Sequence, residues 1–216
     1  NGADSITNSG ENVSIYAAAS GMTSIVNSGA YATVSSPFNS GGVASANSCY
    51  LYNTGQQSKL YFRSGGHDLM INEADYCTLD GGNGNDTIKN WGDYCLLAGN
   101  GSSDTIENYG NNVTISPLFG VDVLNLGSDN SVTISCQFMT GNASNPSLHD
   151  YNPEKHLLQY TAGNWNIAHT VDSDHTYIKA SDPSQHYRDF NVKIYGATTG
   201  DIVRMQFGDA SEFNYT

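Results

Sequence analysis

The sequence predicts an all-β protein, in which a parallel β-solenoid of about seven coils of 18–20 residues precedes a small C-terminal antiparallel β module. Three observations lead to this. The segment Asp86–Asn90 recurs almost unchanged as Asp104–Asn108, and a glycine turn and a second short strand follow each copy. Such short periods are typical of coils that bury apolar side chains by stacking. The repeat then stops, so we assign residues 1–139 to the solenoid, 140–155 to a linker and 156–216 to the module or cap.

The repeat extends in both directions from this pair. Asp122 follows Asp104 at the same interval that separates Asp104 from Asp86, and the earlier copies follow one another with small insertions. These earlier copies are Asp68–Asn72, Cys49–Asn53, Thr23–Asn27 and Asp4–Asn8. Because equivalent positions of successive coils stack on one another, this alignment predicts columns of like side chains along the solenoid.

Two polar columns follow from the alignment. The first contains the asparagines that end the first strand of each coil, and stacked amides hydrogen-bond along a column, so we interpret it as a structural ladder. Its members are Asn8, Asn27, Asn53, Asn72, Asn90 and Asn108. The second column contains Asp68, Asp86, Asp104 and Asp122. Stacked carboxylates about 4.8 Å apart repel one another, so we expect something to neutralise them.

The turn before Asp86 carries a family resemblance. The segment Gly81–Lys89 matches the nine-residue G-G-x-G-x-D-x-U-x pattern, and the chain here resembles the hemolysin-type (RTX) calcium-binding repeats. The resemblance is strongest over residues 65–135, is degenerate before them, and does not extend past residue 140. It implies Ca²⁺ bound between successive turns of a β-roll. The residues it implies as metal ligands are Asp68, Gly82, Gly84, Asp86, Asn100, Ser102 and Asp104.

The turns on either side of this match depart from the pattern. The turn over residues 98–104 keeps its aspartate but loses glycines at their expected places, and the turn over residues 64–68 is truncated. We therefore expect one or two calcium ions rather than a long metal stack. The alternative is a diverged repeat whose aspartates only cap turns.

Four cysteines occur, at Cys49, Cys77, Cys95 and Cys136. Cys77 and Cys95 lie one repeat apart at an inward position, so they stack either as two buried thiols or as a disulfide between adjacent coils. Cys49 and Cys136 lie about four coils apart, so we do not expect them to meet within one subunit. If either is oxidised, its partner belongs to another chain or to the C-terminal segment.

The charge of the chain bears on its partners and location. With 8 basic and 21 acidic residues and a net charge of −13, the chain has few cations with which to contact nucleic acid or an anionic membrane surface. No apolar run is long enough to predict membrane insertion. We expect an extracellular or cell-surface location. Glycosylation sequons at Asn12, Asn112 and Asn142 are candidate glycan sites, although such sequons arise by chance in a chain rich in Asn, Ser and Thr.

Strand-like runs continue after the predicted linker. We expect strands at 156–160, 165–170, 176–180, 190–195 and 201–207, separated by Gly, Asp and Pro turns. Five of the six histidines lie beyond residue 140, but none forms an HxH or HExxH pattern, so we do not predict a catalytic site. A polysaccharide lyase or epimerase of β-helix architecture is the enzymatic alternative.

The first coil already begins at Asp4 without a polar capping segment, and we expect further coils or another subunit to cover that edge. The sequence therefore predicts an extracellular structural protein that self-assembles head-to-tail into a surface or filament component. The alternatives are a carbohydrate-binding or carbohydrate-modifying module and a fragment of an adhesin passenger. Tyrosines and Trp91 at the turns fit either a sugar-binding surface or a hydrophobic seam.

Overall fold

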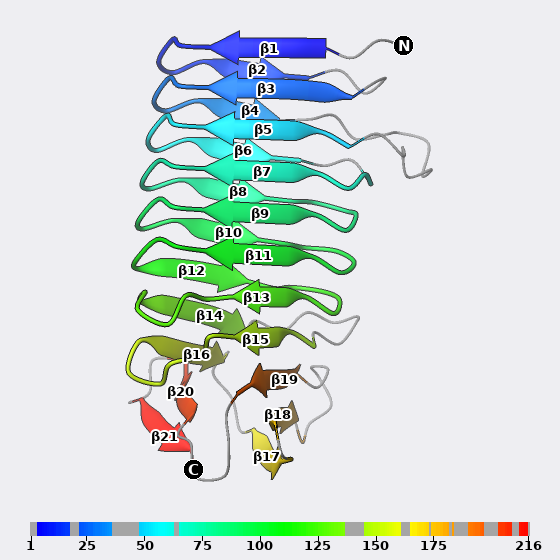
Figure 1. Ribbon diagram of the computed structural model, residues 1–216, viewed down its shortest axis with the longest axis vertical. Helices are drawn as coiled ribbons and strands as arrows, with labels where there is room; N and C mark the ends of the chain where they lie inside the picture. The colour runs from blue at the N-terminus through cyan, green and yellow to red at the C-terminus, as the bar shows by residue number, and fades with distance from the viewer. Residues whose placement is uncertain are drawn as a thin grey trace.

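The computed structural model describes residues 4–17, 22–35, 48–62, 65–136, 145–160, 165–172, 174–181, 183, 190–196, 203–208 and 212–215. These residues form strands and turns, without a helix, and most of the strands stack along one axis in two parallel sheets (Figure 1). This confirms the predicted fold class, a β-solenoid followed by a small antiparallel segment.

The first sheet has eleven strands, and it is parallel from β1 through β19. In spatial order they are β1 (Asp4–Asn8), β3 (Thr23–Asn27), β5 (Tyr50–Asn53), β7 (Leu69–Asn72), β9 (Thr87–Asn90), β11 (Thr105–Asn108), β13 (Val123–Asn125), β15 (Ser147–His149), β19 (Phe190–Tyr195), β18 (His175–Ser181) and β17 (Asn166–Val171). The last two strands are antiparallel additions, β18 to β19 and β17 to β18.

The second sheet has ten strands and is parallel from β2 to β20, with β21 antiparallel at its end. In spatial order they are β2 (Ser14–Tyr16), β4 (Thr33–Ser35), β6 (Lys59–Tyr61), β8 (Thr78–Asp80), β10 (Leu96–Ala98), β12 (Val113–Ser116), β14 (Val132–Cys136), β16 (His156–Tyr160), β20 (Val203–Phe207) and β21 (Phe213–Tyr215).

The core lies between the two sheets and follows directly from the repeat. Each short strand alternates its side chains, so the isoleucine of a Thr-Ile-x-Asn segment points inward while its neighbours face outward. The first sheet contributes a fully buried column of Ile25, Leu51, Met70, Ile88, Ile106, Leu124 and Leu148. The second contributes Val34, Leu60, Leu79, Leu97, Ile115, Ile134 and Leu158. Each such side chain contributes roughly 1.5–3 kcal/mol of burial free energy.

The predicted boundary between solenoid and linker is wrong. β15 lies inside the predicted linker, yet it pairs in parallel with β13, and β16 pairs in parallel with β14. Residues 145–160 thus form an eighth coil, and β19 and β20 extend both sheets further. Asn27 and Asn53 of neighbouring coils are 26 residues apart, so this coil is longer than the predicted 18–20 residues because of an insertion. Part of the predicted linker, residues 140–144, lies outside the described residues.

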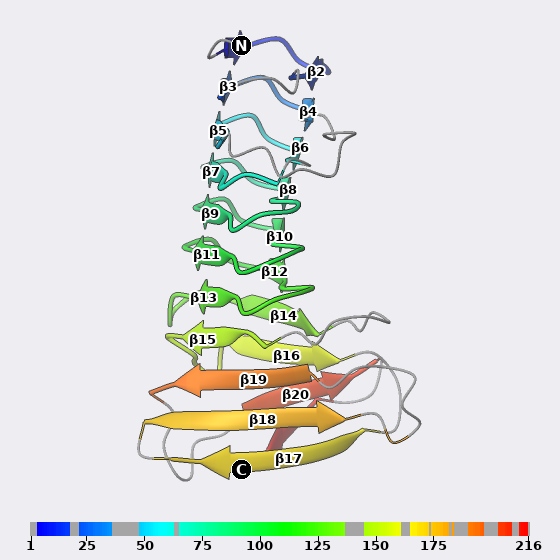
Figure 2. The same ribbon diagram turned by 90° about the vertical axis from the view of Figure 1, so that its right-hand side faces the viewer.

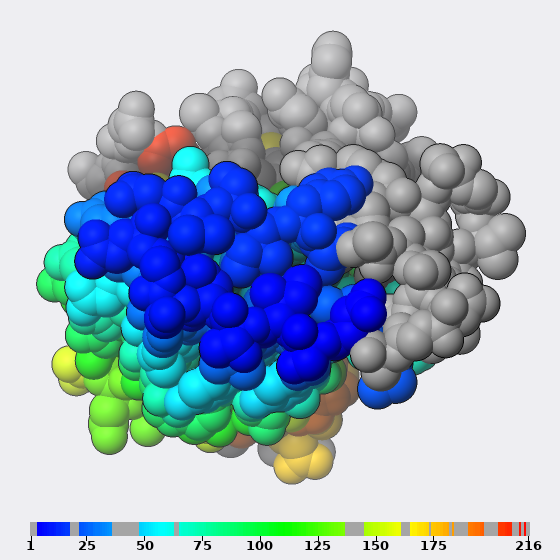
Figure 3. Space-filling view, turned by 90° about the horizontal axis from the view of Figure 1, so that it is seen from above, coloured from blue at the N-terminus to red at the C-terminus, as the bar shows by residue number. Residues whose placement is uncertain are grey.

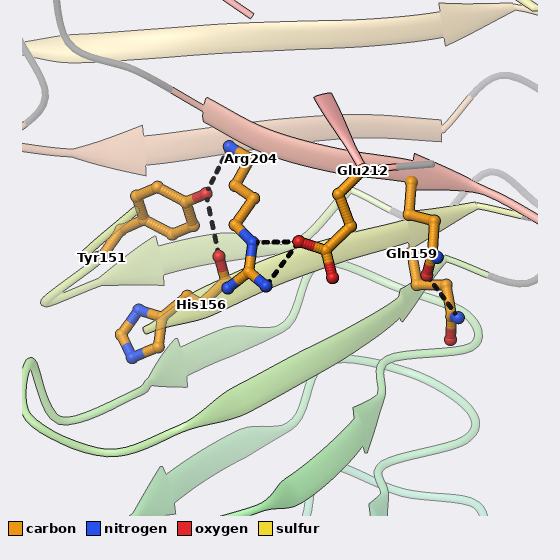
Figure 4. Close-up of polar contacts among 6 residues, drawn as sticks. Tyr151, His156, Gln159, Arg204 and Glu212 are labelled. Atoms are coloured by element: carbon orange, nitrogen blue, oxygen red, sulfur yellow. Dashed lines mark hydrogen bonds and ion pairs between the residues drawn. The ribbon is translucent and has the colours of Figure 1, made fainter. Parts of the chain in front are cut away.

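The C-terminal strands close one end of the stack. Figure 2 shows β19, β18 and β17 side by side below β15, with β20 behind them. The five expected strand ranges correspond to β16, β17, β18, β19 and β20, with bounds that agree within two residues. Tyr151 joins this end to the solenoid: its hydroxyl accepts the backbone N–H of Arg204 at 3.0 Å and donates to the carbonyl of His156 at 3.4 Å (Figure 4). The Arg204 guanidinium in turn pairs with Glu212.

Candidate calcium site

The four aspartates of the acidic column lie inside the solenoid, each at the turn that precedes the first strand of its coil. Asp68, Asp86, Asp104 and Asp122 are each 0–2 % exposed. Each carboxylate accepts, through Oδ1, the backbone N–H of the equivalent residue one coil nearer the N-terminus. These bonds are Cys49 to Asp68 at 2.6 Å, Asp68 to Asp86 at 2.8 Å, Asp86 to Asp104 at 2.8 Å and Asp104 to Asp122 at 3.0 Å. The aspartates therefore join adjacent coils.

The second oxygen of each of three carboxyl groups is unsatisfied. Oδ2 of Asp86, Asp104 and Asp122 is buried without a hydrogen-bond partner. Burial therefore disfavours the charged form, and it raises the pKa of Asp86 from 3.8 to about 8, that of Asp122 to about 7 and that of Asp104 to about 6. The backbone N–H bonds oppose this rise only partly. At neutral pH these three carboxyl groups are thus partly protonated unless a cation lies beside them.

The turn that precedes the aspartates has the same backbone in successive coils. Gly82 and Gly84 have φ of 88° and 125°, and their counterparts Asn100 and Ser102 have φ of 70° and 89°. Loss of the glycines has therefore not changed the turn conformation, although a serine at such a φ is strained. At Gly84 the glycine is also needed because a Cβ would overlap the carbonyl oxygen of Gly66.

Two further glycines make room for two of the unsatisfied oxygens, which lie where a Cβ would be. A Cβ at Gly81 would lie 2.9 Å from Oδ2 of Asp86, and a Cβ at Gly99 would lie closer still to Oδ2 of Asp104. The cradle therefore combines buried carboxylate oxygens with turn carbonyls, which are the hard oxygen donors that Ca²⁺ prefers. The carbonyls of Gly82 and Asn100 each accept one N–H from the next coil, and each retains a second lone pair.

The donor set therefore fits calcium by its chemistry. Within the described ranges no group of three or more His, Cys, Asp or Glu side chains is placed to hold a metal ion. A cation at this turn would consequently take part of its coordination from backbone, amide and hydroxyl oxygens. The residues that would supply them are those implied by the repeat: Asp68, Gly82, Gly84, Asp86, Asn100, Ser102 and Asp104.

The asparagine column forms a continuous ladder inside the opposite turn. Each Nδ2 donates to Oδ1 of the next asparagine at 2.6–2.9 Å, from Asn8 through to Asn108. Each Nδ2 also donates to the carbonyl two residues further along the chain. Leu126 takes the next place in this column, where it is fully buried.

All four cysteines are buried free thiols. The backbone N–H of Cys77 points at Sγ of Cys95 at 3.4 Å, and the ladder amides of Asn53 and Asn72 contact the two sulfurs. A disulfide is therefore not present, and of the two arrangements expected for this pair the structure has the stacked thiols. Cys49 directly precedes β5 of the first sheet, and Cys136 is the last residue of β14 in the second sheet.

Aromatic side chains line the outside of the asparagine turn. Tyr76 stacks on Tyr94 with ring centroids 5.0 Å apart, and Trp91 stacks on Tyr109 at 4.8 Å. All four are about half exposed. Because each ring covers one face of its partner, a sugar could not stack between the rings of a pair. This arrangement favours a hydrophobic seam along the turn over a sugar-binding surface.

The candidate glycan sites lie on this same turn. Asn12 and Asn112 are exposed and have φ of 57° and 55°, a left-handed conformation that asparagine tolerates. The third candidate, Asn142, lies outside the described residues. The exposure of the first two leaves them accessible, and their glycosylation stays a prediction.

Sequence reasoning missed the role of His156, which is fully buried in the column of Val132. Its Nδ1 accepts the backbone N–H of Asn152 at 2.9 Å, and its Nε2 lies 3.2 Å from the carbonyl of Gly127, to which it donates. Burial lowers the pKa of His156, so the ring is neutral and serves packing. The register with β14 could have been found only by recognising the eighth coil.

The fold and the two internal ladders define the class of protein, a parallel β-solenoid with buried polar columns. Comparisons with protein-family models, curated proteins and solved structures found no match. The described residues include no helix with the length and apolar character needed to cross a membrane.

Proposed function

We propose that this chain is an extracellular structural protein that assembles head-to-tail into a surface or filament component, with Ca²⁺ stabilising its acidic turn. The observation that carries the proposal is the incomplete burial of the first coil. Ile6 and Ile15 are only partly buried, whereas their partners one coil further, Ile25 and Val34, are fully buried. Figure 3 views this end of the stack, where the first coil forms the blue surface.

The ends of the first sheet support the same proposal. Among the described residues, β1 and β17 are the outer strands of the first sheet, and β2 and β21 those of the second. β17 runs in the same direction as β1, since two antiparallel steps separate it from β19. A translation along the axis therefore brings β17 of one copy beside β1 of the next with parallel polarity. Such a heterologous contact repeats without closing.

The assembly is tested by charging the first coil. Replacing Ile6 and Ile15 by lysine places two cations on the apolar end of the core, which should prevent stacking of a second copy. Tyr16→Lys is the matched control, because Tyr16 lies on the same coil but is 70 % exposed. Negative-stain microscopy and light scattering, with calcium and after chelation, should show filaments for the unmodified chain and Tyr16→Lys only. A monomeric unmodified chain in both conditions would refute the filament.

The calcium component is tested separately by stability. When bound, the cation would supply the positive charge that lets the buried carboxylates ionise. Ca²⁺ should raise the melting temperature of the unmodified chain at pH 8 and should leave the melting temperature of Asp86→Asn unchanged. Asp93→Asn is the control, since Asp93 lies at the opposite turn, where it accepts the N–H of Asn111. If calcium does not move the melting temperature of the unmodified chain, this component of the proposal fails, whatever the assembly result.

A further inference from the structure

An aromatic surface formed by four half-exposed rings runs along the outside of the asparagine turn. The rings form two rows, in which Tyr76 stacks on Tyr94 and Trp91 stacks on Tyr109. Each of the four side chains is 46–54 % exposed. Figure 1 shows the turns that carry them one above another at one long edge of the stack, where β7 joins β8, β9 joins β10 and β11 joins β12. The surface therefore lies on the side of the stack, away from both ends.

The backbone of this turn makes tyrosine an unfavourable residue. One position of the turn has a φ of 55–58° in successive coils, and its occupants are Asn12, Tyr31, Gln57, Tyr76, Tyr94 and Asn112. Asparagine tolerates this left-handed conformation, whereas a bulky side chain there is strained. Tyr76 and Tyr94 thus stand where asparagine suits the backbone better, and about half of each ring is in contact with solvent. Such a placement points to contact with a partner rather than to a requirement of the fold.

Carboxylates separate the two rows of rings along the chain. Asp93 lies between Trp91 and Tyr94, and Asp75 is its counterpart one coil earlier. Oδ1 of Asp75 accepts the backbone N–H of Asp93 at 2.8 Å, and Oδ1 of Asp93 accepts that of Asn111 at 2.7 Å. These bonds fix both carboxylates at the turn. The second oxygen of each takes no part in them and can pair with a cation.

The charge of these turns is negative. Residues 73–76, 91–94 and 109–112 include Glu73, Asp75 and Asp93 but no lysine or arginine. Lys89, on the adjoining strand β9, is paired with Glu107 at 3.0 Å. Charge complementarity therefore favours a cationic partner for this surface.

Among the cationic groups of proteins, the arginine guanidinium matches both the rings and the carboxylates. It is planar, it stacks on aromatic rings, and its fork of N–H groups pairs with carboxylates. The lysine ammonium is a strongly hydrated point charge without a plane to stack. A second copy of this chain is a poor source of such groups, because it has 8 basic residues against 21 acidic ones and the equivalent turns of its first six coils are acidic or uncharged. The matching partner is therefore a different protein.

We propose that this surface binds an arginine-rich segment of another protein. Guanidinium groups of the segment pair with Asp75 and Asp93 and lie against the neighbouring rings of Trp91 and Tyr94. An aspartate followed by a tyrosine occurs in two successive coils, so a segment with several arginines engages both coils at once. The proposal depends neither on calcium at the acidic turn nor on assembly through the first coil, because both lie elsewhere on the stack.

Calorimetric titration of the full chain with hexa-arginine amide, at about 0.15 M salt and with calcium present, tests the proposal. Hexalysine amide carries the same charge without planar groups, and argininamide supplies one guanidinium outside a segment. We expect saturable binding of hexa-arginine, with hexalysine and argininamide at least about tenfold weaker. Equal binding of the two hexapeptides would show attraction by net charge alone, and argininamide as tight as hexa-arginine would assign the surface to a small cation. Either result, or no binding of hexa-arginine, would overturn the proposal.

The groups of the surface are tested with residues that occur at the same positions one coil later. Tyr94→Asn and Asp93→Asn introduce the residue types of Asn112 and Asn111, so the turn retains its backbone conformation. Each should weaken hexa-arginine binding by about two- to fivefold, the effect of one cation–π contact or one exposed ion pair. Circular dichroism spectra and melting temperatures establish that the variants remain folded.

Tyr31→Asn is the matched control for these substitutions. Tyr31 has the same left-handed φ and is 54 % exposed, but it follows Ala30 rather than an aspartate. Its replacement should leave the affinity for hexa-arginine unchanged. An equal loss in Tyr31→Asn, or unchanged binding by both Tyr94→Asn and Asp93→Asn, would overturn the proposal.

Discussion

The asparagine ladder should be a major source of stability, and Asn90→Ala tests this at its centre. The side chain of Asn90 is fully buried and takes part in three hydrogen bonds. Its Oδ1 accepts from Asn72 at 2.7 Å, and its Nδ2 donates to Asn108 at 2.9 Å and to the carbonyl of Gly92 at 2.7 Å. Alanine removes all three and leaves their partners buried.

The size of the effect follows from these bonds. Each contributes about 1 kcal/mol net, so the loss is about 3 kcal/mol, and buried groups left unsatisfied increase it. For a chain of this length that corresponds to a fall of about 6–12 °C in melting temperature. Asn90→Asp sharpens the test, because a carboxylate would face the acceptor oxygens of Asn108 and Gly92. It should cost more at pH 7 than at pH 4, where a protonated carboxyl donates.

Urea unfolding followed by far-ultraviolet circular dichroism measures the change. Asn111→Ala is the matched control: Asn111 lies on the same turn as Asn108 but is exposed, with its Oδ1 accepting only a 3.3 Å bond from Ser131. We expect the control to lie within about 0.5 kcal/mol of the unmodified chain. If Asn90→Ala is equally mild, or if Asn90→Asp is as stable as the unmodified chain at pH 7, the ladder does not stabilise the stack as reasoned.

Three further predictions address other features. Gly84→Ala should cost about 2–4 kcal/mol in thermal unfolding, because its φ is 125° and a Cβ would meet the carbonyl oxygen of Gly66. Gly196→Ala should cost about 1 kcal/mol in the same series, because its φ is 78° but a Cβ there would meet no atom within 4 Å. Because the pKa of Asp86 is raised from 3.8 to about 8, its contribution to stability is complete below pH 3.8 and is lost as the pH rises to about 8. In the presence of a chelator, the stability of Asp86→Asn relative to the unmodified chain should therefore rise by up to about 1.4 kcal/mol per pH unit across that range. A difference in stability that stays constant with pH would contradict the raised pKa. Tyr151→Phe leaves the Arg204 N–H without its acceptor and should cost about 1–2 kcal/mol. Tyr109→Phe removes an exposed bond to Glu107 and should change stability by less than about 0.5 kcal/mol, and equal effects of the two substitutions would argue against a stabilising role for the partly buried Tyr151 hydroxyl.

The repeat made most of the solenoid predictable. A short, constant period with one apolar position per strand determines which side chains point inward, so the stacking of Ile88 on Ile106 follows from spacing alone. Strand alternation similarly located β16 and β19. These are local properties of the chain, and no distant contact is needed to recognise them.

The eighth coil was not predictable because its register is hidden. Leu148 stacks on Leu124 across a longer interval of chain than the one between Ile88 and Ile106, and β15 has only one apolar side chain between Ser147 and His149. The register of β18 with β19 was missed for a related reason. It places Lys179 opposite Asn191 and Tyr177 opposite Lys193, and sequence spacing does not specify such a pairing.

The direction of the ladder bonds gives the solenoid a chemical polarity. Every ladder amide donates toward the C-terminal end, so the first coil presents the Oδ1 acceptor of Asn8 on its outer side, beyond the bond this atom accepts from Gly10. The backbone N–H groups of Asp68, Asp86 and Asp104 donate in the same direction. Two molecules that met first coil to first coil would bring two acceptor oxygens together. A strand with a donor group at this position would instead extend the ladder. A stack that grew by this end would therefore be directional, because its two ends would differ chemically.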